Sequence, residues 1–157
     1  MSSTIINIVL VLIIILPMAY FMMGSKSNKK ENEEFTNKAK QAGLNPEKTG
    51  VFRNAKIAID KTQSKLCYIS KLKDNELHVV DLKDIKQCEV NKIYHTESVH
   101  NQATNILKNV SIYLKSSNKT EEVIPIYDGS VDVQIGDDLL EAMDWSKIIN
   151  HQIKTMA

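Results

Sequence analysis

The sequence predicts an α+β protein: an N-terminal transmembrane helix, then an antiparallel sheet or partial barrel of about 6–7 strands, then a C-terminal amphipathic helix that caps the sheet. Three observations predict this fold class. Residues 5–23 form an apolar run without a charged side chain. Residues 51–127 hold short β-like runs separated by polar turns, and residues 136–153 carry an apolar stripe at helical spacing.

The apolar run at residues 5–23 is long enough to cross a bilayer, since about 1.5 Å per residue gives roughly 28 Å. Lys26, Lys29 and Lys30 follow the run and no basic side chain precedes it. The lysine bias therefore predicts a single-pass protein of the cell membrane with a cytoplasmic C-terminal domain. The lipid bilayer is then one expected partner. The residues expected to anchor the chain in it are Ile5, Ile8, Val9, Leu12, Ile15, Leu16, Pro17 and Phe21.

Other interpretations of this run remain open. A secretory signal peptide would have a basic start and a small-residue cleavage site, and the sequence has neither. A buried core helix would show a polar stripe, whereas only Asn7 interrupts the run. The reversed orientation would make the remainder an exported or envelope-facing structural domain.

Three segments follow from these patterns: an anchor at 1–25, a polar linker with a short helix at 26–48, and a β domain with its C-terminal helix at 49–157. Gly43 is expected to end the linker helix. Residues 31–157 hold all 19 acidic residues and 17 of the 20 basic ones, a formal net charge of −2. A basic footprint is absent, so we expect no nucleic-acid partner.

The β-like runs are short and alternate imperfectly between apolar and polar residues, as in strands with one exposed face. The polar stretch at residues 96–104 has no strong period and is expected to be the longest loop. Pro125 cannot donate to a ladder, which predicts that the last strand is an edge or is bulged. The expected strands cover residues 56–60, 65–69, 77–80, 85–93, 110–115 and 122–127.

The C-terminal helix is expected to begin near Gly136, with Asp137 and Asp138 complementing its dipole. Its apolar face must pack on the sheet, because no other element is available to cover it. The residues expected to dock it are Leu139, Ala142, Trp145 and Ile149.

This order of elements resembles the pleckstrin-homology-like (PH-like) superfold. The resemblance covers roughly residues 50–153 and rests on the early run at residues 57–60, on Asp84-Ile85 before the fourth strand, and on Trp145 in the last helix. It implies a bent antiparallel sheet capped by the helix. Some such domains hold phosphoinositides with a basic first loop, but here only Lys61 and Lys65 flank that loop, with no arginine. The lysine- and isoleucine-rich composition indicates a bacterial, low-GC genome.

No motif identifies a reaction. His95 and His100 lie near Glu97 and are the candidates for a general base or a metal ligand, which would make a small membrane-bound hydrolase. Cys67 and Cys88 form no CxxC pair and are expected to be buried thiols, so neither a metal nor a cofactor is expected.

The sequence therefore predicts a membrane-tethered, non-enzymatic module that binds a protein or peptide partner. A partner segment could add to the edge near Pro125, or lie beside the C-terminal helix.

Overall fold

The computed structural model describes residues 29–99, 102–118 and 120–156. The chain divides into two compact units, residues 1–37 and 38–157. A helix occupies residues 29–41, and its end has the expected glycine stop. Gly43 has a positive φ of 80°, its N–H bonds the carbonyl of Lys40, and the N–H of Leu44 bonds the carbonyl of Ala39. These two bonds satisfy carbonyls that the end of a helix leaves open. All that follows concerns the second unit.

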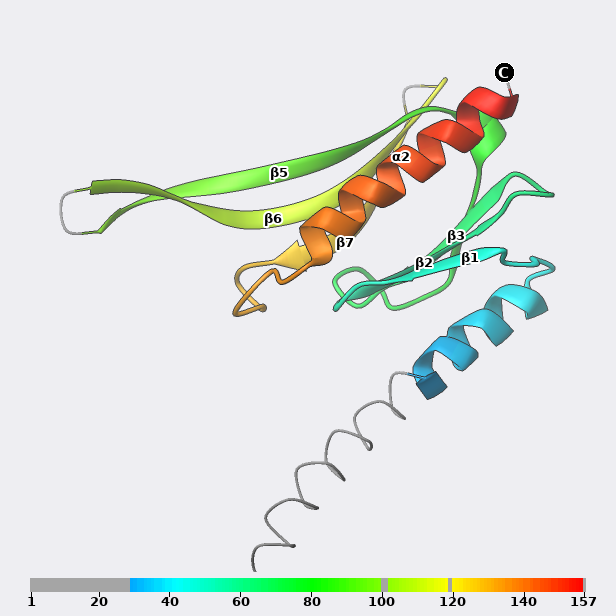
Figure 1. Cartoon of the computed structure of the whole chain (residues 1–157), viewed down its shortest axis with the longest axis horizontal. Helices are drawn as coiled ribbons and strands as arrows, with labels where there is room; N and C mark the ends of the chain where they lie inside the picture. Colours follow the sequence, from blue (N-terminus) through cyan, green and yellow to red (C-terminus); the bar gives the residue numbers. More distant parts are fainter. Residues whose placement is uncertain (1–28, 100–101, 119, 157) are drawn as a thin grey trace, which may run out of the picture. The chain divides into compact units, whose positions relative to one another are not determined.

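Seven antiparallel strands form two sheets (Figure 1). The first sheet has the order β1-β2-β3-β4 and the second the order β5-β6-β7. A short 3-10 helix, η1, joins the sheets, and helix α2 follows the last strand. The elements are β1 (Lys48–Val51), β2 (Ala55–Asp60), β3 (Lys65–Ser70), β4 (His78–Asp81), η1 (Leu82–Asp84), β5 (Ile85–Val99), β6 (Gln102–Ser116), β7 (Glu121–Asp128) and α2 (Asp138–Met156).

One core is built from the inner faces of both sheets and from one face of α2. From Val110 to Leu114 in β6 every second residue is buried, as expected for a strand with one exposed face. The structure places Ala142, Trp145 and Ile149 of α2 in this core, with Leu139 partly buried against it. The fully buried strand residues include Ile57, Ile59, Leu66, Tyr68, Val110, Ile112, Leu114, Ile124 and Ile126.

The indole of Trp145 lies directly against the backbone of Gly50 in β1. A Cβ atom built on Gly50 would be 2.1 Å from Nε1 of Trp145, so only glycine fits at this position. Trp145 is 4% exposed, and the Nζ atom of Lys48 lies 5.9 Å from the centre of its ring. The helix is thus fixed to the first sheet by its tryptophan as well as to the second sheet by its flank.

The predicted fold class is wrong in two respects. The seven strands form two separate sheets rather than one sheet or partial barrel, because the chain turns through η1 between β4 and β5 and these strands do not pair. Within the described residues, no helix is both long enough and apolar enough to cross a membrane. Helix α2 has the length, but it carries charges along its outer face.

The transmembrane helix of the predicted fold therefore has no counterpart among the described residues, and the single-pass membrane assignment loses its support. The run at residues 5–23 and all eight predicted anchor residues lie outside the part of the chain that the structure describes. Both orientations weighed from the lysine bias depended on that helix.

The expected loop at residues 96–104 is also wrong. Strands β5 and β6 remain paired as far as Val99 and Gln102, so this stretch is mostly the end of a long hairpin. Its polar sequence misled the prediction because both faces of a projecting ribbon are exposed, and neither face needs the apolar alternation that marks a half-buried strand.

We predict that Gly50→Ala destabilises the protein by about 1–3 kcal/mol, because the added methyl group overlaps the indole. Trp145→Ala should cost about 3–5 kcal/mol by leaving a cavity. In the Trp145→Ala background, Gly50→Ala should cost much less, and urea unfolding of all four proteins measures this coupling. Thr49→Ala, at an exposed position of the same strand, is the control. Additive costs would show that the two residues do not meet.

Candidate functional site

The histidines singled out by the sequence do not form a site in the described residues. His95 lies on β5, exposed and opposite Ile106 of β6, whereas His100 lies outside the described residues. Among the residues described, no three histidine, cysteine, aspartate or glutamate side chains gather so that they could hold a metal ion. The geometry gives the hydrolase alternative no support.

The acidic run before α2 forms turns, as expected, and Asp138 at the start of the helix bonds the β1–β2 connection instead of capping α2. The carboxylate of Asp132 accepts hydrogen bonds from Nδ2 of Asn54 at 2.5 Å and from the N–H of Asp128 at 3.2 Å. Asp138, the first residue of α2, accepts from the N–H of Arg53 at 3.2 Å. These bonds tie the β7–α2 connection to the first sheet.

Both cysteines lie in strands and are buried, at 1% exposure for Cys67 and 2% for Cys88. Both are free thiols. Burial raises the pKa of each to about 11, so the reactive thiolate is scarce near neutral pH.

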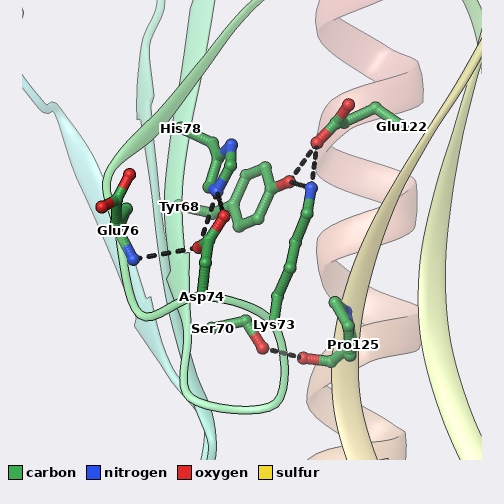
Figure 2. Close-up of polar contacts among 8 residues, drawn as sticks. All are labelled: Tyr68, Ser70, Lys73, Asp74, Glu76, His78, Glu122 and Pro125. Carbon is green, nitrogen blue, oxygen red and sulfur yellow. Dashed lines mark hydrogen bonds and ion pairs between the residues drawn. The ribbon is translucent and has the colours of Figure 1, made fainter.

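A polar cluster joins the two sheets at the end of β3 (Figure 2). The Nζ atom of Lys73 donates to the carboxylate of Glu122 at 2.8 Å and to the hydroxyl of Tyr68 at 2.9 Å. The hydroxyl of Tyr68 in turn donates to the same carboxylate oxygen. Lys73 comes from the β3–β4 turn and Glu122 from β7, so the three side chains brace one sheet against the other.

This cluster is not arranged for proton transfer. Burial and the hydrogen bond to Glu122 raise the pKa of Tyr68 to about 12. The hydrogen bonds to Glu122 and Tyr68 also raise the pKa of Lys73. A neutral phenol and a charged amine at neutral pH supply neither a base nor a nucleophile. We therefore interpret the cluster as a structural brace.

His78 extends the brace along β4. Its ring stacks on the ring of Tyr68, with centroids 4.9 Å apart, and its Nε2 atom lies 2.8 Å from each carboxylate oxygen of Asp74. Asp74 also accepts the N–H of Glu76. These contacts fix the β3–β4 turn that presents Lys73 (Figure 2).

The outer edge of β7, which the sequence suggested as a binding edge, is closed at Pro125. Proline has no N–H to offer. Its carbonyl accepts a hydrogen bond of 2.8 Å from the hydroxyl of Ser70, a residue of β3. A partner strand would find neither a donor nor a free acceptor at this residue.

Side chains of α2 close the outer edge of β5 at Cys88. The Oδ1 atom of Asn150 accepts from the N–H of Cys88 at 2.9 Å, and its Nδ2 atom donates to the carbonyl of Cys88 at 2.7 Å. The hydroxyl of Ser146 donates to the same carbonyl at 3.0 Å. The amide of Asn150 thus makes the pair of bonds that a neighbouring strand would make.

Beyond Cys88 the β5 edge is open. In an antiparallel strand alternate residues point their N–H and C=O to the same side, so Val90 and Lys92 also face outward. The ladder has no irregularity between Gln87 and Ile93 that would change this alternation. Among the described residues, no hydrogen bond engages these outward groups. We call the stretch Val90–Lys92 the open β5 edge.

The flank of helix α2 that contacts β5 carries apolar as well as polar side chains. Leu139, Met143, Ser146 and Asn150 follow at helical spacing along one flank, and the last two contact β5 at Cys88. The helix runs opposite to β5, with its C-terminal end near η1 (Figure 1). One turn earlier, Met143 is 38% exposed, and Leu139 is partly buried.

The sequence suggested that a partner segment could lie beside the C-terminal helix, but it did not identify the residues that define the candidate site. Ser146 and Asn150 were not singled out, although two small polar residues four apart on the flank of an apolar face are a signal for a capped strand edge. Pro125 has no backbone donor, and this correctly indicated that its strand lies at the edge of a sheet. The same missing donor makes this edge a poor one for binding a partner strand.

No protein-family model, curated protein or solved structure matches this chain. The resemblance to PH-like domains, the absence of enzymatic activity and the cytoplasmic location therefore stay predictions.

We predict that the cluster of Lys73, Tyr68 and Glu122 makes the free energy of unfolding decrease as the pH falls into the acid range. Burial acts to raise the pKa of Glu122, but hydrogen bonds from Lys73 and Tyr68 outweigh it and lower the pKa below the ordinary 4.5. A carboxyl group with a lowered folded pKa adds to the free energy of unfolding above about pH 4.5, and this contribution is lost as the pH falls further. Because both partners are about one-third exposed, the contribution should be about 1 kcal/mol or less.

Glu122→Gln should therefore flatten the pH dependence of the melting temperature below about pH 4.5. Glu121→Gln, at the exposed neighbouring position of β7, is the control and should leave the profile unchanged. An unaltered profile for Glu122→Gln would contradict the brace.

Proposed function

We propose that this chain is a non-enzymatic binding module that takes up an extended segment of a partner protein along the open β5 edge. The observations that carry the proposal are the two outward-facing residues beyond Cys88, Val90 and Lys92, and the exposed Met143 on the flank of α2 whose Ser146 and Asn150 contact β5 at Cys88. An added strand would bond their free N–H and C=O groups, which is the usual physics of strand addition to a sheet.

The rigidity of this edge supports the proposal. The side chain of Val90 packs against the core while its backbone faces outward, so the strand cannot withdraw to satisfy itself elsewhere. Asn150 marks where the site ends, because it already occupies both groups of Cys88. An edge ordered before binding loses little conformational entropy when a partner strand is added.

The flank of α2 indicates the chemistry of the partner segment. Side chains of a strand alternate between two faces, so every second residue of the added segment would meet Leu139 and Met143. We therefore expect apolar residues at alternate positions of the partner, with polar residues between them facing solvent. Methionine suits such a surface because its flexible thioether adapts to different apolar side chains.

We predict that short peptides selected from a displayed random library against the purified chain will carry this alternation. Lys92→Pro should weaken their binding about tenfold or more, because proline removes the outward N–H from the edge without breaking the bonds to β6. Lys92→Ala, which keeps that N–H, is the matched control and should bind almost normally. Fluorescence anisotropy of a labelled peptide measures the dissociation constants.

A second pair of variants tests the flank. Met143→Asp should weaken peptide binding, whereas Val131→Asp, at an exposed apolar position in the β7–α2 connection, should not. Both positions are exposed, so melting temperatures should show that both variants fold. Peptides that bind Lys92→Pro and Met143→Asp as well as the unaltered chain would overturn the proposal.

A further inference from the structure

The hairpin of β5 and β6 projects beyond the rest of the second sheet (Figure 1). Strand β7 pairs with β6 only from Asn109 to Lys115, so the segments 93–99 and 102–108 form a two-stranded ribbon, here called the arm. Three large apolar side chains of the arm are exposed, Ile93 at 48%, Tyr94 at 54% and Ile106 at 43%, whereas Leu107 packs against the core. A two-stranded ribbon is marginally stable alone in water, and such exposure favours a partner.

The β5 edge of the arm lacks the usual protections against strand pairing. Protected edges carry proline or lysine, or are covered. Between Ile93 and Glu97 there is neither residue, and no described element pairs with this edge. The bulge between Ile93 and Tyr94 adds its extra residue, Lys108, to β6. The alternation along β5 therefore continues from Cys88 to Thr96, whose N–H and C=O also face outward.

The sequence of this edge is complementary to itself about Thr96. In an antiparallel pair of two identical β5 edges centred there, Thr96 lies opposite its own copy as a hydrogen-bonded pair. His95 then lies opposite Glu97 of the other copy, and Glu97 opposite the other His95. An imidazole can donate to a carboxylate in both of these pairs, and cross-strand threonine pairs are also favourable.

The neighbouring registers that keep the alternation lack this complementarity. Moving the centre to His95 puts Glu97 opposite Ile93, and moving it to Ile93 puts Glu97 opposite Glu89. Like charges opposite each other destabilise a sheet. A register about Lys92 would again set His95 opposite a glutamate, Glu89, but it sets Lys92 opposite its own copy and needs the backbone groups of Cys88 that Asn150 already bonds. On its own arm His95 lies directly opposite Ile106 and Glu97 directly opposite Thr104, so neither has a charged residue directly across from it.

We propose that two copies of this chain associate through their arms, pairing their β5 edges antiparallel about Thr96 to form a four-stranded ribbon. The interface is isologous, as a two-fold axis requires. The paired residues, 93–99 of each copy, do not include Val90 or Lys92, so the association goes beyond the proposed peptide binding and does not depend on it. A dimer of this kind would present two binding sites, one at each end.

Site-directed cross-linking tests the register. In the full chain, kept in a mild detergent because residues 5–23 are uncharged and apolar, Thr96→Cys should form a disulfide-linked dimer on mild oxidation. Opposed residues of a hydrogen-bonded pair have Cα atoms about 5.5 Å apart, within the range of a disulfide. Thr104→Cys, an equally exposed threonine on the other strand of the same arm, should cross-link several-fold less. The unaltered chain controls for Cys67 and Cys88, which are buried.

Charge exchange tests the pairing itself without relying on a disulfide. Glu97→Lys alone and His95→Glu alone should each raise the dimer dissociation constant about tenfold in analytical ultracentrifugation. The double variant with His95→Glu and Glu97→Lys should restore dimerisation, because opposite charges again face each other. Equal cross-linking of Thr96→Cys and Thr104→Cys, a monomeric unaltered chain at high concentration, or a double variant no better than the single ones would each overturn the proposal.

Discussion

An open β-sheet leaves a row of backbone donors and acceptors along each outer strand, and the rest of this structure depends on how those rows are satisfied. At β7 the row is interrupted at Pro125, which has no N–H. The carbonyl of Pro125 already accepts a hydrogen bond from the hydroxyl of Ser70. At β5 the row is closed at Cys88, by the amide of Asn150. Since the two sheets are not closed into a barrel, the β5 edge keeps outward backbone groups that a strand of another chain could bond.

Helix α2 can cover part of the β5 edge because its opposite side is fixed. Trp145 fills the space that a side chain at position 50 would need, and this close approach sets the distance between the helix and β1. With the apolar face committed to the core, the flank bearing Ser146 and Asn150 comes within hydrogen-bond reach of β5. The same rotation leaves Met143, one turn before Ser146, 38% exposed. The packing of one tryptophan therefore determines which part of the edge is covered.

Local patterns in the sequence were enough to find the strands near the core, the end of the linker helix and the buried face of α2. The alternation of apolar and polar residues in β6 and the helical spacing of apolar residues around Trp145 can each be recognised within one short segment of sequence. The division into two sheets was not accessible, because it depends on whether β4 and β5 pair, a non-local outcome decided at η1. The arm was missed because both of its faces are exposed, so its sequence shows no alternation of apolar and polar residues. The open β5 edge was missed in detail because it is defined by backbone groups, which every residue carries.

One strand, β5, carries three different environments in succession, and the alternation of its backbone links them. Cys88 faces the helix, Val90 and Lys92 face open solvent beside it, and Thr96 faces outward on the arm. All four lie on the same edge because the bulge opposite Ile93 and Tyr94 places its extra residue in β6. Had that residue been inserted in β5, the outward groups of the arm would have shifted by one. The backbone groups of Thr96, between His95 and Glu97, would then have faced β6 instead of facing outward, and the complementarity of the arm would be lost. The position of a single bulged residue thus connects the covered edge, the proposed binding edge and the proposed contact between copies.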